Sequence, residues 1–119
     1  MAPSTREKLP SRRAHETVTF AVGNVTYHAA IGRPFDAGTG ALGPALELFL
    51  TAGKPGSPVE ATARDAGVIA SLALQYGVPA AEIGRALTRD EAGAPAGPLG
   101  VVFDEIVSRG ETAEQARER

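Results

Sequence analysis

The amino-acid sequence predicts an α+β fold, with an N-terminal three-stranded antiparallel sheet followed by about three helices in a single domain. In the first half of the chain, apolar and polar side chains alternate with the two-residue period of strands. In the second half, helix caps and helical spacing of apolar residues predominate. Strands and helices are thus segregated rather than alternating, which favours the α+β class, and 119 residues leave room for one core.

The first two strands are predicted to form a β-hairpin. Val18, Phe20 and Val22 alternate with small or polar residues, and the same alternation resumes from Val25 to Ile31. The intervening Gly23-Asn24 suits a two-residue turn, because both residues tolerate the positive φ of primed turns. We therefore expect one face of the hairpin to be buried and the other to be wetter.

A third strand is expected after a glycine-rich loop from Gly32 to Gly43. We predict that this strand runs from Ala45 to Thr51. Its leucines, at positions 46, 48 and 50, would face one side of the sheet, and Glu47 and Phe49 would face the other.

A long helix is predicted between Ser57 and Gly77. Ser57-Pro58-Val59-Glu60 has the form of a capping box, in which Ser57 accepts an early backbone N–H and Glu60 reaches back. Gly77 readily takes the left-handed conformation that ends many helices. After Asp65 the helix surface is nearly uncharged. Its apolar residues are Ala61, Ala63, Ala66, Val68, Ile69, Leu72 and Ala73.

Two further helices complete the predicted fold. One starts at Pro79, and a loop of alanine, glycine and proline from Ala92 to Pro98 separates it from the last helix. That last helix begins at Leu99 and ends near Ser108 or Gly110, with apolar residues at helical spacing.

The predicted domain spans residues 15–108, between a basic arm of residues 1–14 and a polar tail of residues 109–119. We expect the arm to be a flexible terminus, with an anchor for phosphate or an acidic partner as the alternative. The tail lacks an apolar face with which to dock.

Composition excludes several classes of protein. The chain has no cysteine, so a disulfide framework, a thiolate metal site and thiol chemistry are excluded. No apolar run approaches the ~20 residues that cross a bilayer, and no secretion signal is recognisable, so we expect a soluble cytoplasmic protein. His15 and His28 lack metal-ligand spacing, and no nucleophile motif is present. We therefore expect no metal, no cofactor and no catalytic residue.

The loop before the long helix is a candidate anion site. Lys54, Gly56 and Ser57 place a cation and flexible backbone beside a helix N-terminus, an arrangement that suits a phosphate or a nucleotide. Arg12 and Arg13 would join this site if the basic arm folds back. The P-loop spacing is missing, so a plain strand-to-helix connection is the alternative.

Residues 70–87 suggest a second, DNA-binding interpretation. Two helices joined by a glycine turn are typical of a helix-turn-helix, in which Arg85 and Arg89 would contact DNA. The electrostatics argue against this alternative, because Glu82 lies on the same helix and the net charge of the chain is −2. Nucleic acid is therefore not the expected partner.

Several short strings occur in the order found in one family. They are Leu9-Pro10-Ser11-Arg12-Arg13, Glu47-Leu48-Phe49-Leu50, Lys54-Pro55-Gly56-Ser57, Ser71-Leu72-Ala73-Leu74-Gln75-Tyr76-Gly77-Val78-Pro79, Ala86-Leu87-Thr88-Arg89-Asp90 and Gly97-Pro98-Leu99-Gly100. The strings are spread from residue 9 to residue 100, and over most of its length the chain resembles the TSCPD-type C-terminal region of adenosylcobalamin-dependent ribonucleotide reductases. It resembles in particular the small stand-alone proteins with this domain. The name-giving Thr-Ser-Cys-Pro-Asp string is absent.

The resemblance implies a non-catalytic accessory or binding module linked to deoxyribonucleotide synthesis. Reductases of this family form their radical on a cysteine in a large barrel, and this chain has neither that length nor a cysteine. The implied partners are a ribonucleotide reductase or another protein, with a nucleotide or phosphate as ligand.

Overall fold

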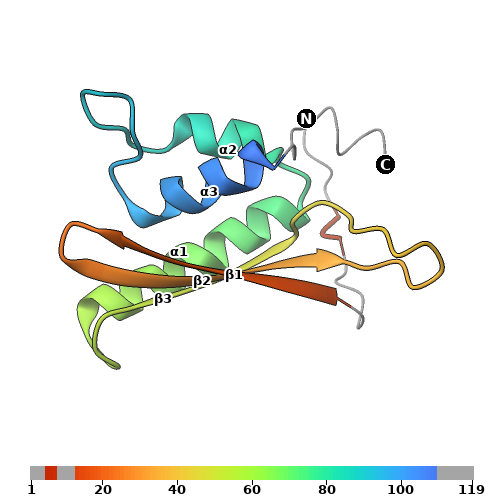
Figure 1. Cartoon of the computed structure of the whole chain (residues 1–119), viewed down its shortest axis with the longest axis horizontal. Coiled ribbons are helices and arrows are strands. Elements are labelled where there is room, and N and C mark those ends of the chain that lie inside the picture. Colours follow the sequence, from red (N-terminus) through yellow and green to blue (C-terminus); the bar gives the residue numbers. More distant parts are fainter. Residues whose placement is uncertain (1–4, 8–12, 110–119) are drawn as a thin grey trace.

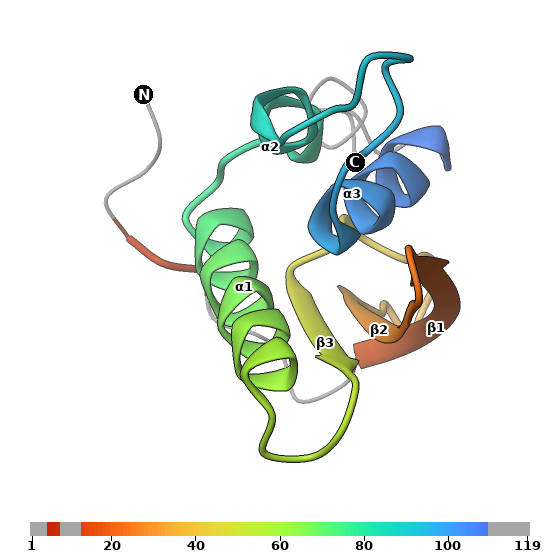
Figure 2. The same ribbon diagram turned by 90° about the vertical axis from the view of Figure 1, so that its left-hand side faces the viewer.

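The computed structural model describes residues 5–7 and 13–109 of the chain. An antiparallel sheet in the order β1-β2-β3 is formed by β1 (Arg13–Val22), β2 (Val25–Pro34) and β3 (Glu47–Ala52). Helices α1 (Pro58–Gln75), α2 (Ala80–Ala86) and α3 (Pro98–Ser108) follow. Helices α2 and α3 lie over one face of the sheet (Figure 1), and α1 lies alongside β3 (Figure 2). The predicted α+β fold is confirmed.

The predicted hairpin is also confirmed. Val22 pairs with Val25 across the two-residue turn, and the rings of Phe20 and Tyr27 stack at 5.7 Å between centroids. Gly23 has a φ of 61°, whereas no non-glycine residue in the described part of the chain has a positive φ. A positive φ at only the first turn residue is the pattern of a type II′ turn.

Three strand boundaries differ from the prediction, and α3 begins at Pro98, which was predicted to end the loop. The strand β1 begins at Arg13, so the end of the expected basic arm belongs to the sheet. The strand β2 continues to Pro34, because Gly32 pairs with residues on both sides and is not part of the loop. The strand β3 runs from Glu47 to Ala52, and so begins two residues later than predicted. The expected tail beyond Arg109 and most of the arm, including Arg12, lie outside the described residues.

The predicted Ser57 cap and Gly77 end of α1 both form, but Glu60 reaches back one residue further than in a capping box, to the Gly56 N–H. The Ser57 hydroxyl accepts the Glu60 N–H at 3.2 Å, and the Glu60 carboxylate accepts the Gly56 N–H at 2.7 Å. At the other end, Gly77 has a φ of 93° and its N–H donates to the Leu74 carbonyl. The next N–H, from Val78, donates to the Ala73 carbonyl, which completes a Schellman motif.

The core lies between the sheet and the helices. Its largest fully buried side chains are Phe103, Ile31, Leu48, Leu50, Ile106 and Val102. Those from α3 recur at helical spacing and those from the sheet alternate along each strand, so each element buries one face.

The outer edge of β3 is covered by α1. An added Cβ on Gly67 would lie 3.0 Å from the Leu48 carbonyl oxygen, so a side chain here would have to push the helix and the strand slightly apart. The Ser71 hydroxyl oxygen accepts the Leu48 N–H at 2.8 Å, and the Gln75 amide donates to the Leu46 carbonyl at 2.9 Å. The helix thereby supplies partners for backbone groups that a free sheet edge would expose.

On the sheet face opposite α3, Glu47 crosses the central strand. His15, Gly32 and Glu47 form one row across the three strands. Because Gly32 has no side chain, the carboxylate of Glu47 lies over it and reaches β1. There Glu47 Oε2 is 2.8 Å from Arg13 Nε and 2.9 Å from His15 Nε2, while Glu47 is only 5% exposed.

We predict that Gly32→Ala is destabilising by about 1–3 kcal/mol, the usual range for a buried group that loses its partners. The added Cβ would lie 2.8 Å from Glu47 Cγ, so the carboxylate must leave its place over the strand. Urea denaturation measures the change. Gly84→Ala is the control and should not be destabilising, because its Cβ would make only an ordinary van der Waals contact, 3.6 Å from Phe103 Cβ, and alanine favours the helix α2.

A double mutant distinguishes displacement of the Glu47 carboxylate from a general intolerance of β2 to substitution. In a Glu47→Ala background nothing remains to be displaced, so Gly32→Ala should then add little further cost. An equal cost of Gly32→Ala with and without Glu47 would contradict this account.

Candidate functional site

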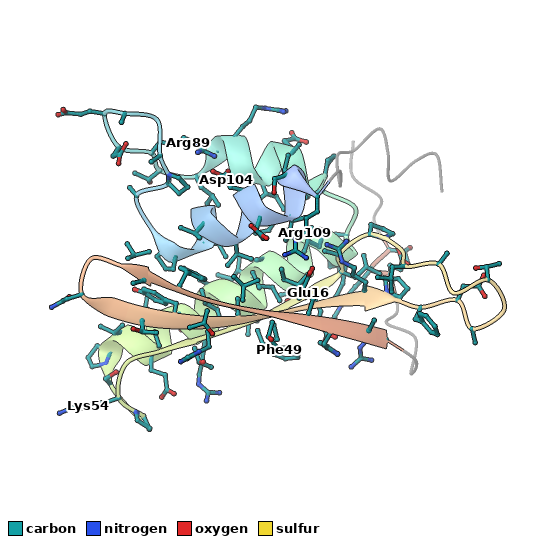
Figure 3. All side chains as sticks on the ribbon, in the orientation of Figure 1. Glu16, Phe49, Lys54, Arg89, Asp104 and Arg109 are labelled. Carbon is teal, nitrogen blue, oxygen red and sulfur yellow. The ribbon has the colours of Figure 1, made fainter. Side chains whose placement is uncertain are left out.

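The predicted anion loop connects β3 to α1, and Lys54 projects from it at one end of the molecule (Figure 3). The N–H groups of Gly56 and Glu60 are the natural donors for an anion at this helix end. Both already have partners within the chain, the Glu60 carboxylate and the Ser57 hydroxyl. An anion would therefore have to displace the capping box, and the loop geometry favours a strand-to-helix connection.

The structure does not bring Arg13 to Lys54. Arg13 is held by Glu47 at the start of β3, and Lys54 follows the other end of that strand. The strand from Glu47 to Ala52, which lies between them, is about 17 Å long. The combined surface of Lys54, Arg12 and Arg13 is therefore not assembled by the described residues, and Arg12 lies outside them.

The residues predicted for DNA contact have different surroundings. Arg85 is exposed on α2, whereas Arg89 ties the loop after α2 to α3 (Figure 3). The Arg89 guanidinium donates to both carboxylate oxygens of Asp104, at 2.6 and 3.0 Å, and to the Gly93 carbonyl. These hydrogen bonds lower the pKa of Asp104 and raise the pKa of Arg89. Arg89 thus has a structural role at the place where the helix-turn-helix interpretation requires a DNA contact.

The two histidines lie on the sheet face opposite α3. His15 contacts Glu47 and the ring of Phe49, and His28 Nδ1 is 3.1 Å from the Thr19 hydroxyl. Among residues 5–7 and 13–109, no three His, Asp or Glu side chains gather in a way that would hold a metal ion. Within the same residues, no helix has the length and apolar character needed to cross a membrane.

An exposed apolar surface lies on α1 and the adjoining strand. We call it the α1 outer surface. It consists of Phe49, Val68, Ile69, Leu72 and Tyr76, which are 54, 58, 68, 37 and 39% exposed. The four helical members point away from the buried Gly67, Ala70 and Leu74, as helical geometry requires.

A groove connects the strand and helix parts of the α1 outer surface. Phe49 and Val68 line it together, and its volume is about 390 Å³. Arg6 and Arg64 also line it, with Arg6 donating to Gln75 and Arg64 lying 3.5 Å from Glu60. Glu47, Thr51, Ser71 and Gln75 line the groove as well, so polar groups lie between Phe49 and the apolar side chains of α1.

A scan against protein-family models found no match to the chain. Searches of the curated proteins and of the solved structures found no significant match either.

Sequence reasoning grouped the apolar residues of α1 as one surface but did not divide them between inside and outside. The structure buries Ala63 and leaves Val68, Ile69 and Leu72 exposed. The exposure of some of these residues could have been predicted from the sequence, because a helix that is apolar on nearly every side has more apolar surface than one small sheet can cover.

We predict that the Asp104 carboxyl titrates at a lower pH in the wild-type protein than in Arg89→Ala, because the variant removes the donors that favour the ionised form. The folded-state pKa is depressed, so the pair stabilises the fold above the unfolded-state pKa and loses this effect as the pH falls through the folded-state pKa. NMR titration of Asp104 measures the difference. Arg85→Ala is the control and should leave the midpoint unchanged, whereas equal midpoints in all three proteins would contradict the assignment.

Proposed function

We propose that the chain is a non-catalytic binding module that docks onto a protein partner through the α1 outer surface. We further propose that this partner is an adenosylcobalamin-dependent ribonucleotide reductase, which would link the chain to deoxyribonucleotide synthesis. The observation that carries the proposal is the cluster of five large, exposed apolar side chains on α1 and β3.

Clustered exposure of this kind is a property of interaction sites. Single exposed apolar residues are ordinary, but contiguous patches mark surfaces that another molecule covers. Burial of such a patch is favourable by roughly 25 cal/mol for each Å² removed from water. Tyr76 and Phe49 are aromatic anchors of the type that dominate protein–protein binding energies.

The edge of the surface has the character of an interface rim. Arg64 is 63% exposed beside the groove, and its nearest acid, Glu60, is 3.5 Å away. Asp65 is also exposed on α1. Charges of both signs at a rim influence orientation and association rate more than affinity. The apolar centre would therefore supply most of the binding energy.

The choice of partner rests on the resemblance. Three members of the α1 outer surface, Phe49, Leu72 and Tyr76, lie within strings that resemble the C-terminal region of these reductases. An apolar surface on these strings is suited to contact with such an enzyme.

Isothermal titration of the chain against the purified reductase from the same cell tests the proposal. We expect saturable binding that Leu72→Ser weakens by about tenfold or more, which corresponds to 1.4 kcal/mol. Leu42→Ser is the matched control, because Leu42 is also exposed, at 47%, but lies in the loop between β2 and β3. The affinity of the Leu42→Ser variant for the reductase should equal that of the wild-type chain.

Two outcomes would reject the proposal. If the wild-type chain does not bind the reductase, the proposed partner is wrong. If Leu72→Ser and Leu42→Ser weaken binding equally, or neither does so, the α1 outer surface is not the docking site. Circular dichroism of both variants establishes that they remain folded.

A further inference from the structure

A cleft separates the first turns of α1 from the start of α3. Its volume is about 460 Å³, which lies within the range of pockets that enclose small organic molecules. Four parts of the chain form its walls: β2, the N-terminal half of α1, the segment after α2 and the first turn of α3. A helix of a partner protein, about 10 Å across with its side chains, is poorly matched to a space of this volume.

The cleft has no charged lining residue among those that the structure describes. Its walls are mainly apolar and include Val59, Leu87 and Leu99. Three lining side chains carry hydroxyl groups: Tyr27, Thr62 and Thr88. Since burial of a charge without a partner is costly, a lining of this kind selects a neutral ligand with few polar atoms.

Small residues keep the cleft open. Two of the five residues of α1 that line it are alanines, Ala63 and Ala66, where a leucine would be equally compatible with a helix and would fill space. Ala66 is only partly buried, so a leucine at this position would project into the cleft.

We propose that the cleft binds one neutral, mainly apolar small molecule, which the hydroxyl groups of Tyr27, Thr62 and Thr88 orient. The site is separate from the α1 outer surface, because no member of that surface lines it. The two proposals can therefore fail independently.

The neutral dye N-phenyl-1-naphthylamine is a suitable probe, since its fluorescence rises in apolar surroundings. We expect saturable binding with a stoichiometry of one. Ala66→Leu fills the cleft and should weaken binding by about tenfold, which corresponds to 1.4 kcal/mol. Ala61→Leu is the matched control, because it makes the same change on an exposed position of α1 that does not line the cleft, and its affinity should stay within about twofold of the wild type.

Amide chemical shifts of the wild-type protein provide a measurement that does not depend on any variant. The dye should shift the signals of Thr62, Thr88 and Leu99 before those of Ile69 and Leu72. Shifts centred on Ile69 and Leu72, or equal weakening by both leucine variants, would place the dye on the α1 outer surface and overturn the proposal. Absence of saturable binding by the wild-type protein would overturn it as well.

Discussion

The close contact of α1 with the edge of β3 is the constraint on which the remaining structure depends. Gly67 permits the approach, and Ser71 and Gln75 bind backbone groups of the edge strand. A three-stranded sheet without such a cover would expose an unpaired edge, which favours aggregation. The helix α1 thus covers this edge of the sheet. Hydrogen bonds from its side chains take the place of those that a neighbouring strand would make.

This contact also fixes the rotation of α1 about its axis. With Gly67 and Ser71 directed at β3, helical geometry directs Ile69 and Leu72 to solvent and turns Thr62 and Ala66 toward α3. The apolar surface that we propose for docking and the cleft that we propose for a small molecule are therefore two sides of one helix. Neither would exist if the larger apolar residues of α1 faced the sheet.

Features that depend on neighbours in the sequence could be predicted from it. The hairpin turn, the Ser57 cap and the Gly77 end are encoded by a few adjacent residues, and all three form as expected. Contacts between distant residues could not be predicted. In the sequence Gly32 has the surroundings of a loop residue, but strand pairing places the Glu47 side chain over it. In the same way Arg89 has the position of a DNA contact in the sequence, but in the fold it is hydrogen-bonded to Asp104 of α3. The position of Arg13 far from Lys54 likewise follows from strand pairing, which composition does not encode.

Amide hydrogen exchange at Leu48 tests the central role of the α1–β3 contact most directly. Its N–H points away from β2 and has the Ser71 hydroxyl as its acceptor. We expect this amide to be protected in the wild-type protein and to exchange at least about tenfold faster in Ser71→Ala, while the core amide of Ile31 retains its protection. Rapid exchange of Leu48 in the wild-type protein, or a rate that Ser71→Ala does not change, would contradict the account.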